Sequence, residues 1–376
     1  MIKIPITKPA LDDHEKQGVA RVIDSGWVSQ GPRVAEFEEQ FARFVGTRFA
    51  VATTSCTTAL HAALTVMGIG QGDEVILPSL SFIATANSVL YCGAKPVFAD
   101  IDPNTCNIDV GGIEKRITAR TRAIMPVHQM GLPADLAPIK EIAERYRLIL
   151  IEDAACAVGS RYRGKLIGGH GNMACFSFHP RKIITTGEGG MITTDDEVIA
   201  NRLKRLRHHG MSVSDIERHA ADMVIIESYT ELGYNYRMTD MQAAIGIEQM
   251  KKLPFILTKR KELAHRYDSE LQNIPSIRVP VAPQYADHNY QSYWIELLDS
   301  SPVDRNTLMT ILLEKGIATR RGIMAIHREP CYREYALADL PNTERMTDRT
   351  LLLPIYPSLR EEELMFITNS IREILT

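Results

Sequence analysis

The stretch SFHPRKIITTGEGG, residues 177–190, joins the end of an apolar run to a glycine-rich turn. The run, residues 174–178, has the length and composition of a buried strand. Three glycines within the last four residues indicate that the backbone comes close to another group there. Lys182 lies between the run and the turn. A single lysine is most often a solvated charge, but a lysine in a closed pocket can act as an amine nucleophile and form a Schiff base.

Short apolar runs recur on both sides of this stretch and alternate with amphipathic segments. The segments 57–67 and 136–147 carry apolar residues at spacings of three and four, as helices do. This alternation is typical of α/β units around a largely parallel sheet, so we expect a large doubly wound α/β domain. The expected strands are residues 49–52, 74–77, 96–99, 123–127, 148–151, 174–178 and 191–193.

The pattern changes after Pro254, where a second and smaller domain is expected. We therefore divide the chain into residues 1–254, the large domain, and 255–376, a small α+β domain. No Gly/Ser linker marks the boundary, which favours two parts packed together. The expected elements around and after the boundary are helices at 238–252, 257–271 and 305–315, a strand at 292–297, and a terminal helix from residue 361.

The composition excludes several classes of protein. The 376 residues include 43 Lys and Arg against 46 Asp and Glu, a net charge of −3 that gives no bulk attraction for nucleic acid or an anionic membrane. No apolar run approaches the roughly 18 residues of a membrane span, and the N-terminus lacks a signal-peptide pattern. The six scattered cysteines favour reduced thiols, and no metal-binding spacing occurs. We expect a cytoplasmic protein without a metal site.

Two further strand ends carry polar residues where ligands bind in open α/β sheets, outside the carboxyl ends of the strands. Residues 53–58, TTSCTT, place hydroxyl groups and free backbone N–H groups at the start of a helix, which suits a phosphate but also an ordinary helix cap. Asp153 follows another strand and precedes small residues, where it could face a ligand or cap a helix. A phosphate cup, a carboxylate and a lysine together are what pyridoxal phosphate requires.

Two long motifs carry a resemblance to a known family. They are residues 177–190 and the stretch GYNYRMTDMQAAIG, residues 233–246, and the similarity extends from residues 27–32 to 353–357. The chain resembles the sugar aminotransferases of the DegT/DnrJ/EryC1/StrS family, which are pyridoxal phosphate enzymes of fold type I. The resemblance implies that Lys182 carries the cofactor and that Asp153 pairs with its pyridine nitrogen.

The resemblance also implies the rest of the cofactor site. Phe82 matches the aromatic residue that stacks on the pyridine ring, although it could be a simple core residue. The phosphate would be held by Thr57, Thr58 and Ser177. The residue at the position of Asn235 reaches the cofactor of the neighbouring subunit, which implies a homodimer with shared active sites.

The chain departs from the family pattern at two cysteines. Cys56 stands where members often have glycine, and a backbone contact there survives the change. Cys156 stands where members often have glutamine or histidine, near the phenolic oxygen of the cofactor. A thiol is a weaker hydrogen-bonding group than an amide, so the role of Cys156 stays open.

The function implied by the resemblance is the transfer of an amino group from an amino acid, typically L-glutamate, through pyridoxal and pyridoxamine phosphate to a keto sugar. The acceptor would be a nucleotide-linked 3-keto or 4-keto 6-deoxyhexose, and the product an amino sugar for lipopolysaccharide, glycan or antibiotic assembly. Solvated surface charge is the alternative reading for each residue that we expect to contact this substrate. The residues expected to pair with the diphosphate are Arg237, Arg320 and Arg321, and His327 is expected to line the sugar pocket.

Two alternatives stay open on the same scaffold. One is a pyridoxal phosphate-dependent sugar dehydratase, and the other is a non-catalytic regulator. In relatives that dehydrate sugars the lysine position holds a histidine, so Lys182 favours transamination. A regulator would be expected to have lost parts of the cofactor shell, so Lys182 together with Asp153 counts against this alternative too.

Overall fold

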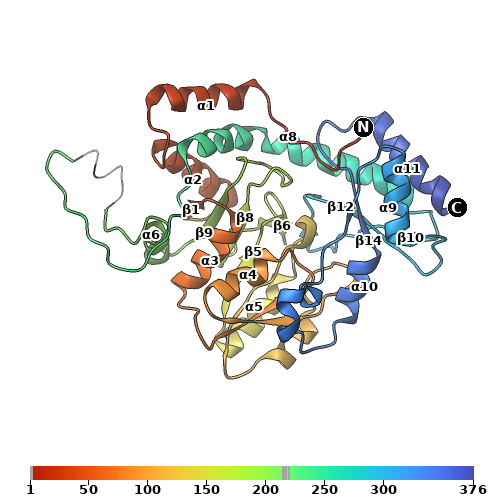
Figure 1. Cartoon of the computed structure of the whole chain (residues 1–376), viewed down its shortest axis with the longest axis horizontal. Coiled ribbons are helices and arrows are strands. Elements are labelled where there is room, and N and C mark those ends of the chain that lie inside the picture. Colours follow the sequence, from red (N-terminus) through yellow and green to blue (C-terminus); the bar gives the residue numbers. More distant parts are fainter. Residues whose placement is uncertain (1–2, 214–217, 219–220) are drawn as a thin grey trace.

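A seven-stranded sheet forms the centre of the larger part of the molecule (Figure 1). The computed structural model describes residues 3–213, 218 and 221–376. The strand order is β1-β9-β8-β5-β4-β2-β3, and only β9 runs against the other six. The seven expected strands and the mostly parallel sheet are confirmed, with strand ends that differ by up to three residues: the strand expected at 123–127 is found at Thr121–Ile124. The strands are β1 (Phe49–Thr53), β2 (Glu74–Pro78), β3 (Lys95–Ala99), β4 (Thr121–Ile124), β5 (Ile149–Asp153), β8 (Met173–Ser177) and β9 (Gly190–Thr194).

Helices cover both faces of this sheet, as a doubly wound fold requires. Alternate strand residues enter different apolar clusters: Cys175 packs with α3, α4 and α6, whereas Ala174 and Phe176 pack with α2 and α8. The helices of this part are α1 (Asp13–Ser25), α2 (Pro32–Val45), α3 (Cys56–Val66), α4 (Ala84–Tyr91), α5 (Leu136–Tyr146) and α6 (Glu197–Leu206). Short 3-10 helices lie at Val110–Gly112, Glu114–Arg116 and Gln129–Gly131.

A second core surrounds a four-stranded antiparallel sheet with the order β10-β12-β14-β13. Its strands are β10 (Ile277–Arg278), β12 (Tyr293–Leu297), β13 (Arg320–Arg321) and β14 (Thr350–Leu353). The accompanying helices are α9 (Arg305–Glu314), α10 (Pro341–Arg349) and α11 (Glu361–Leu375), with 3-10 segments at Ile326–Arg328 and Pro330–Tyr335. A three-stranded sheet joins β6 (Arg161–Tyr162) and β7 (Lys165–Leu166) to β11 (Ala286–Asp287).

The expectation of two helices separated near Pro254 is wrong, because α8 (Asp240–Leu271) is one helix of 32 residues that contains this proline. An interior proline costs a helix about 3 kcal/mol. Leu253 and Ile256, on either side of the proline, are fully buried in the core beneath the helix, and their packing offsets this cost. The division of the chain into two domains at residue 254 stays a prediction. Residue 254 lies inside α8, which runs from the larger part of the molecule into the smaller part (Figure 1).

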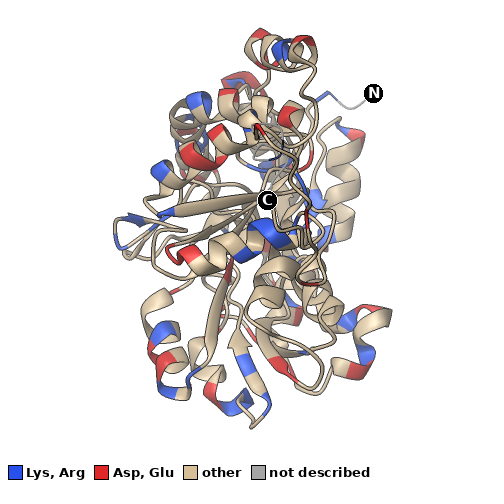
Figure 2. Cartoon of the chain, turned by 90° about the vertical axis from the view of Figure 1, so that its left-hand side faces the viewer, with Lys and Arg blue, Asp and Glu red and all other residues tan. Residues whose placement is uncertain are grey.

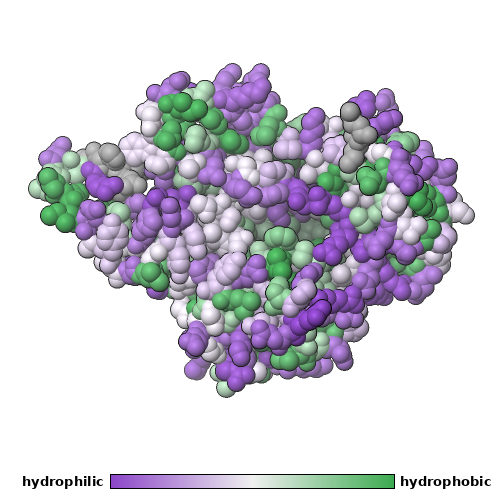
Figure 3. All heavy atoms as spheres, in the orientation of Figure 1, coloured by the Kyte–Doolittle hydropathy of each residue, from purple (hydrophilic) through white to green (hydrophobic). Residues whose placement is uncertain are grey.

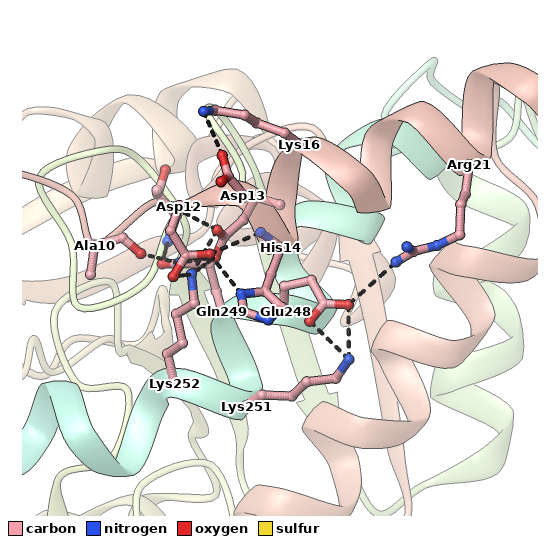
Figure 4. A network of polar contacts seen from close by, with 12 residues as sticks. Ala10, Asp12, Asp13, His14, Lys16, Arg21, Glu248, Gln249, Lys251 and Lys252 are labelled. Atoms are coloured by element: carbon pink, nitrogen blue, oxygen red, sulfur yellow. Dashed lines mark hydrogen bonds and ion pairs between the residues drawn. The ribbon is translucent and has the colours of Figure 1, made fainter.

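Ion pairs attach the N-terminal helix α1 to α8 (Figure 4). Lys252 Nζ lies 2.7 Å from Glu15 Oε2 and 2.8 Å from Asp12 Oδ2. Gln249 Nε2 donates to Glu15 Oε1 at 2.7 Å. Glu15 is almost completely buried, so these donors compensate its carboxylate for the loss of water.

Basic and acidic residues are interspersed along the ribbon in Figure 2. This agrees with the nearly balanced composition of the chain. In the part of the chain that the structure describes, every helix is too short or too polar to cross a membrane.

Candidate active site

The register of the large sheet brings several strand ends to one edge. Ser177, the last residue of β8, pairs with Gly190, the first residue of β9. Gly190 also pairs with Thr53, the last residue of β1, because β9 runs against both neighbours. Asp153, the last residue of β5, pairs with Cys175 on β8. The carboxyl ends of β1, β5 and β8 therefore meet beside the start of β9.

A pocket of about 1010 Å³ opens at this edge, between the large sheet and the smaller antiparallel sheet. Four residues of the expected cofactor shell line it: Phe82, Asp153, Cys156 and Lys182. The expected substrate residues Arg320 and Arg321 also line it, together with Arg181, which was not anticipated. The pocket thus joins a lysine, a buried carboxylate and three guanidinium groups from distant parts of the chain.

Lys182 reaches into the pocket from the loop between β8 and β9. Its backbone N–H donates to His179 O at 2.8 Å. Its Nζ lies 3.1 Å from Cys156 Sγ. Burial favours the neutral amine, but the contact with Cys156 and the nearby carboxylate of Asp153 outweigh burial and raise the pKa of Lys182 above its usual value.

Asp153 is buried, and two donors hold its carboxylate. Thr85 Oγ1 donates to Oδ2 at 2.7 Å, and the backbone N–H of Ala155 donates to Oδ1 at 3.1 Å. Burial raises the pKa of Asp153, while these hydrogen bonds and the charge of Lys182 act in the opposite direction. The Asp153 carboxylate does not serve as the cap of a long helix, since the residues after it form turns.

The segment after β1 does cap a helix. Ser55 is the N-cap of α3, and its side chain accepts from the backbone N–H of Thr58 while Thr58 Oγ1 accepts from the backbone N–H of Ser55. Gly190 packs so closely here that a Cβ atom on it would lie 2.3 Å from Ser55 O. Thr57 and Thr58 are partly buried at this terminus, and Cys56 is buried with its Sγ directed to Cys175 O. Two of the residues expected to hold a phosphate, Thr57 and Thr58, therefore lie at a capped helix N-terminus.

The other residues expected from the sequence lie in different surroundings. The side chain of Ser177 is buried, and its Oγ accepts weakly from His179 N at 3.4 Å. Asn235 is exposed, and its backbone forms a bridge with His208. Arg237 contacts His208 Nδ1 and is not among the residues that line the pocket.

His327 is buried away from the pocket lining. Its Nδ1 lies 2.7 Å from Ser79 Oγ, and its Nε2 lies 3.2 Å from Glu344 Oε1. Its imidazole thus ties the end of β2 to α10.

Three residues in or behind the pocket were not predicted from the sequence. Ser81 and Arg181 line the pocket, and Thr85 lies behind it as the hydrogen-bond donor to Asp153. Ser81 and Thr85 are four residues apart, which is the only sequence signal that they act together. Arg181 directly precedes Lys182 in the sequence, and this position is a signal from which Arg181 could have been predicted as a pocket residue.

Comparison with protein families decides the relationship. The model of the DegT/DnrJ/EryC1/StrS aminotransferase family matches residues 9–372. The chain belongs to this family. Its members are pyridoxal phosphate-dependent aminotransferases, and the large mostly parallel sheet agrees with fold type I.

Individual relatives agree with this membership. The spore coat polysaccharide biosynthesis protein SpsC of Bacillus subtilis is 39% identical, over 99% of this chain and 97% of that protein. The structure of Streptomyces venezuelae DesV with a ketimine intermediate is 33% identical, with a TM-score of 0.91 over 99% and 98% of the two chains. DesI with its TDP-sugar product is 29% identical, with a TM-score of 0.90 over 99% and 93%. The PLP form of Spr1654 from Streptococcus pneumoniae is 27% identical, with a TM-score of 0.92 over 99% and 98%.

Proposed function

We propose that this family member moves an amino group from L-glutamate, by way of pyridoxal phosphate, to a keto group of a nucleotide-linked 6-deoxyhexose. The observation that carries the proposal is the presence of the Lys182 amine and the Asp153 carboxylate in one pocket. These are the two protein groups that the chemistry of the cofactor needs most. The PLP form of Spr1654 and the ketimine complex of DesV support the choice of cofactor.

The residues of the pocket fit pyridoxal phosphate. When bound, the cofactor supplies an aldehyde that takes up the amino group and a ring that accepts electrons. The N-terminus of α3 lies at the same sheet edge but is not part of the pocket lining, and it offers backbone N–H groups and the Thr57 hydroxyl to a phosphate. Asp153 offers a carboxylate to a protonated ring nitrogen. Phe82, with 64% of its surface exposed, offers a free aromatic face at the mouth of the pocket.

Lys182 would hold and move the proton of the reaction. An amine removes a proton only when it is neutral, and burial favours that form. The contact with Cys156 favours the ammonium form, which returns the proton. A lysine that burial pushes toward the neutral form and Cys156 toward the ammonium form can both remove and return a proton, provided that water is kept out of the pocket.

The guanidinium groups at the pocket support a diphosphate-bearing substrate. Arg181 and Arg320 lie near one another, and among the described residues neither side chain forms an ion pair with a carboxylate. Arg321 has a loose contact of 3.8 Å with Glu329. Guanidinium groups suit phosphate oxygens through paired hydrogen bonds. The TDP-sugar product of DesI and the polysaccharide role of SpsC favour an amino sugar product, for which lipopolysaccharide or another glycan is a destination.

We further propose a homodimer, in the cytoplasm, in which Asn235 contacts the cofactor of the second subunit. The described residues between α6 and α8 include a stretch that extends from the body of the molecule (Figure 1). Val224, Ile226 and Leu232, among the described residues of this segment, are 81–90% exposed. Apolar side chains gather on the outer part of the extension (Figure 3). Apolar groups exposed to this extent favour cover by another surface. A second copy of the chain is the proposed cover.

The test is the absorption spectrum of the protein with pyridoxal phosphate, before and after addition of L-glutamate. We expect a visible band that glutamate removes and that a suitable keto sugar nucleotide restores. Lys182→Ala should lose this band and all turnover while keeping the fold and mass of the dimer. Lys165→Ala, at an exposed lysine of β7, is the matched control. Turnover by the Lys182→Ala protein would remove Lys182 from this role.

A further inference from the structure

Asp153 is connected to the start of α4 by a chain of buried hydroxyl groups. Thr85 Oγ1 donates to Asp153 Oδ2 at 2.7 Å, and Ser81 Oγ lies 2.7 Å from Thr85 Oγ1. Both hydroxyl-bearing residues are at most 2% exposed. When Asp153 is ionised its carboxylate only accepts hydrogen bonds, so the Thr85 proton then points to Asp153 and the Ser81 proton points to Thr85. In that state the hydrogen bonds run from Ser81 through Thr85 to Asp153.

These two hydroxyl groups stabilise the negative charge of Asp153, which burial would otherwise disfavour. Asp153 is buried at the carboxyl end of β5, and a buried carboxylate without donors becomes protonated. Thr85 is the stronger of its two hydrogen-bond donors, since its contact is shorter than that of the Ala155 N–H. Ser81 makes Thr85 a better donor, because hydroxyl groups in a chain polarise one another.

We infer that Thr85 is a positioning residue, supported by Ser81, which keeps Asp153 ionised and directed at the ring nitrogen of pyridoxal phosphate. The inference rests on the proposed function, because a protonated Asp153 could not hold the proton of that nitrogen. Thr85 acts through Asp153 and is therefore distinct from the residues that contact the cofactor. Its backbone N–H donates to Phe82 O at 3.1 Å, so one residue anchors both the carboxylate and the loop that carries the ring-stacking candidate.

The other charged and titratable groups around Asp153 do not replace Thr85. Lys182, on the loop after β8, and His128, after β4, act on it electrostatically and make no hydrogen bond to its carboxylate. Cys56 on α3 and Cys175 on β8 are buried thiols whose pKa burial raises, so they are neutral neighbours. Loss of the Thr85 hydroxyl should therefore raise the pKa of Asp153.

The experiment compares Thr85→Val, which has the same shape without the hydroxyl, with Thr85→Ser, which keeps it. The readout is the dissociation constant of pyridoxal phosphate, measured by equilibrium dialysis against the apoprotein from pH 6 to pH 9. We expect Thr85→Val to weaken binding by about tenfold to hundredfold near pH 6, as for a lost hydrogen bond to a charged group. The loss should shrink as the pH rises and Asp153 ionises again. Thr85→Ser should bind like the wild type.

A cofactor analogue in which carbon replaces the ring nitrogen separates positioning from a merely structural role. Its binding should be the same for wild type and Thr85→Val. If Thr85→Val weakens the binding of pyridoxal phosphate and of the analogue equally, or weakens binding to the same extent at every pH, the inference is overturned and the proposed function still stands. If Thr85→Val does not fold, Ser81→Ala should give a smaller loss with the same pH dependence and the same indifference of the analogue. A wild-type protein that binds no pyridoxal phosphate would overturn the proposed function as well.

Discussion

Gly190→Ala tests whether the contact between β9 and the start of α3 builds the phosphate site. A Cβ atom at position 190 would lie 2.3 Å from Ser55 O, 2.5 Å from Ser55 C and 2.7 Å from Cys56 N. All three are backbone atoms, so no side chain can rotate away. Ordinary contact begins at 3.4 Å, so the start of α3 has to move by about 1.1 Å relative to β9.

The size of the effect follows from this displacement. A shift of about 1 Å takes a hydrogen bond of about 2.9 Å beyond the range in which it forms. One hydrogen bond to a charged phosphate is worth about 1.5–3 kcal/mol, which corresponds to about tenfold to hundredfold in affinity. We therefore expect the dissociation constant of pyridoxal phosphate to rise by that factor. The strain should also lower the free energy of unfolding by about 1–3 kcal/mol.

Equilibrium dialysis and urea denaturation of the apoprotein measure the two effects. Gly70→Ala is the matched control, because the nearest atom to its added Cβ is Cys92 O at 3.9 Å. The control should leave both quantities unchanged. A folded Gly190→Ala protein with wild-type affinity for pyridoxal phosphate would refute the reasoning.

Three further predictions concern other buried groups. Cys156→Ala should lower the pKa of Lys182, because the contact with the thiol raises it. Capture of pyridoxal phosphate needs the neutral amine, so its rate should reach half of its maximum at a lower pH than in the wild type. An unshifted pH profile would contradict this prediction. Arg207→Met should cost about 3–5 kcal/mol in urea denaturation, because it leaves the buried carboxylate of Glu38 without its ion pair. Burial lowers the pKa of His288 from 6.5 to about 3, so the folded chain binds fewer protons than the unfolded chain and loses stability as the pH falls below 6.5. His288→Phe should flatten that loss between pH 7 and pH 5, and an equally steep loss would argue for other groups.

Local pattern was sufficient to predict the large sheet. The strands of a sheet covered on both faces are short apolar runs, and the predicted strands 148–151 and 174–178 match β5 and β8 to within two residues at each end. The local sequence pattern was insufficient for α8, where Pro254 indicated a break between two helices. The burial of Leu253 and Ile256 in the core outweighs the local cost of the proline, and such packing is invisible to a local pattern.

The candidate site likewise contains residues that the sequence predicts and residues that only the tertiary structure reveals. Asp153 was identified because it follows an apolar run, and Lys182 because it stands between an apolar run and a glycine-rich turn. Thr85 was missed, because it is 68 residues from Asp153 in the sequence. The sequence by itself determined the strands, the residues at their ends and the family motifs, since these depend on neighbours along the chain. Only the tertiary structure decided which strand ends meet, which hydroxyl donates to Asp153 and which thiol contacts Lys182, because burial and hydrogen bonding depend on neighbours in space.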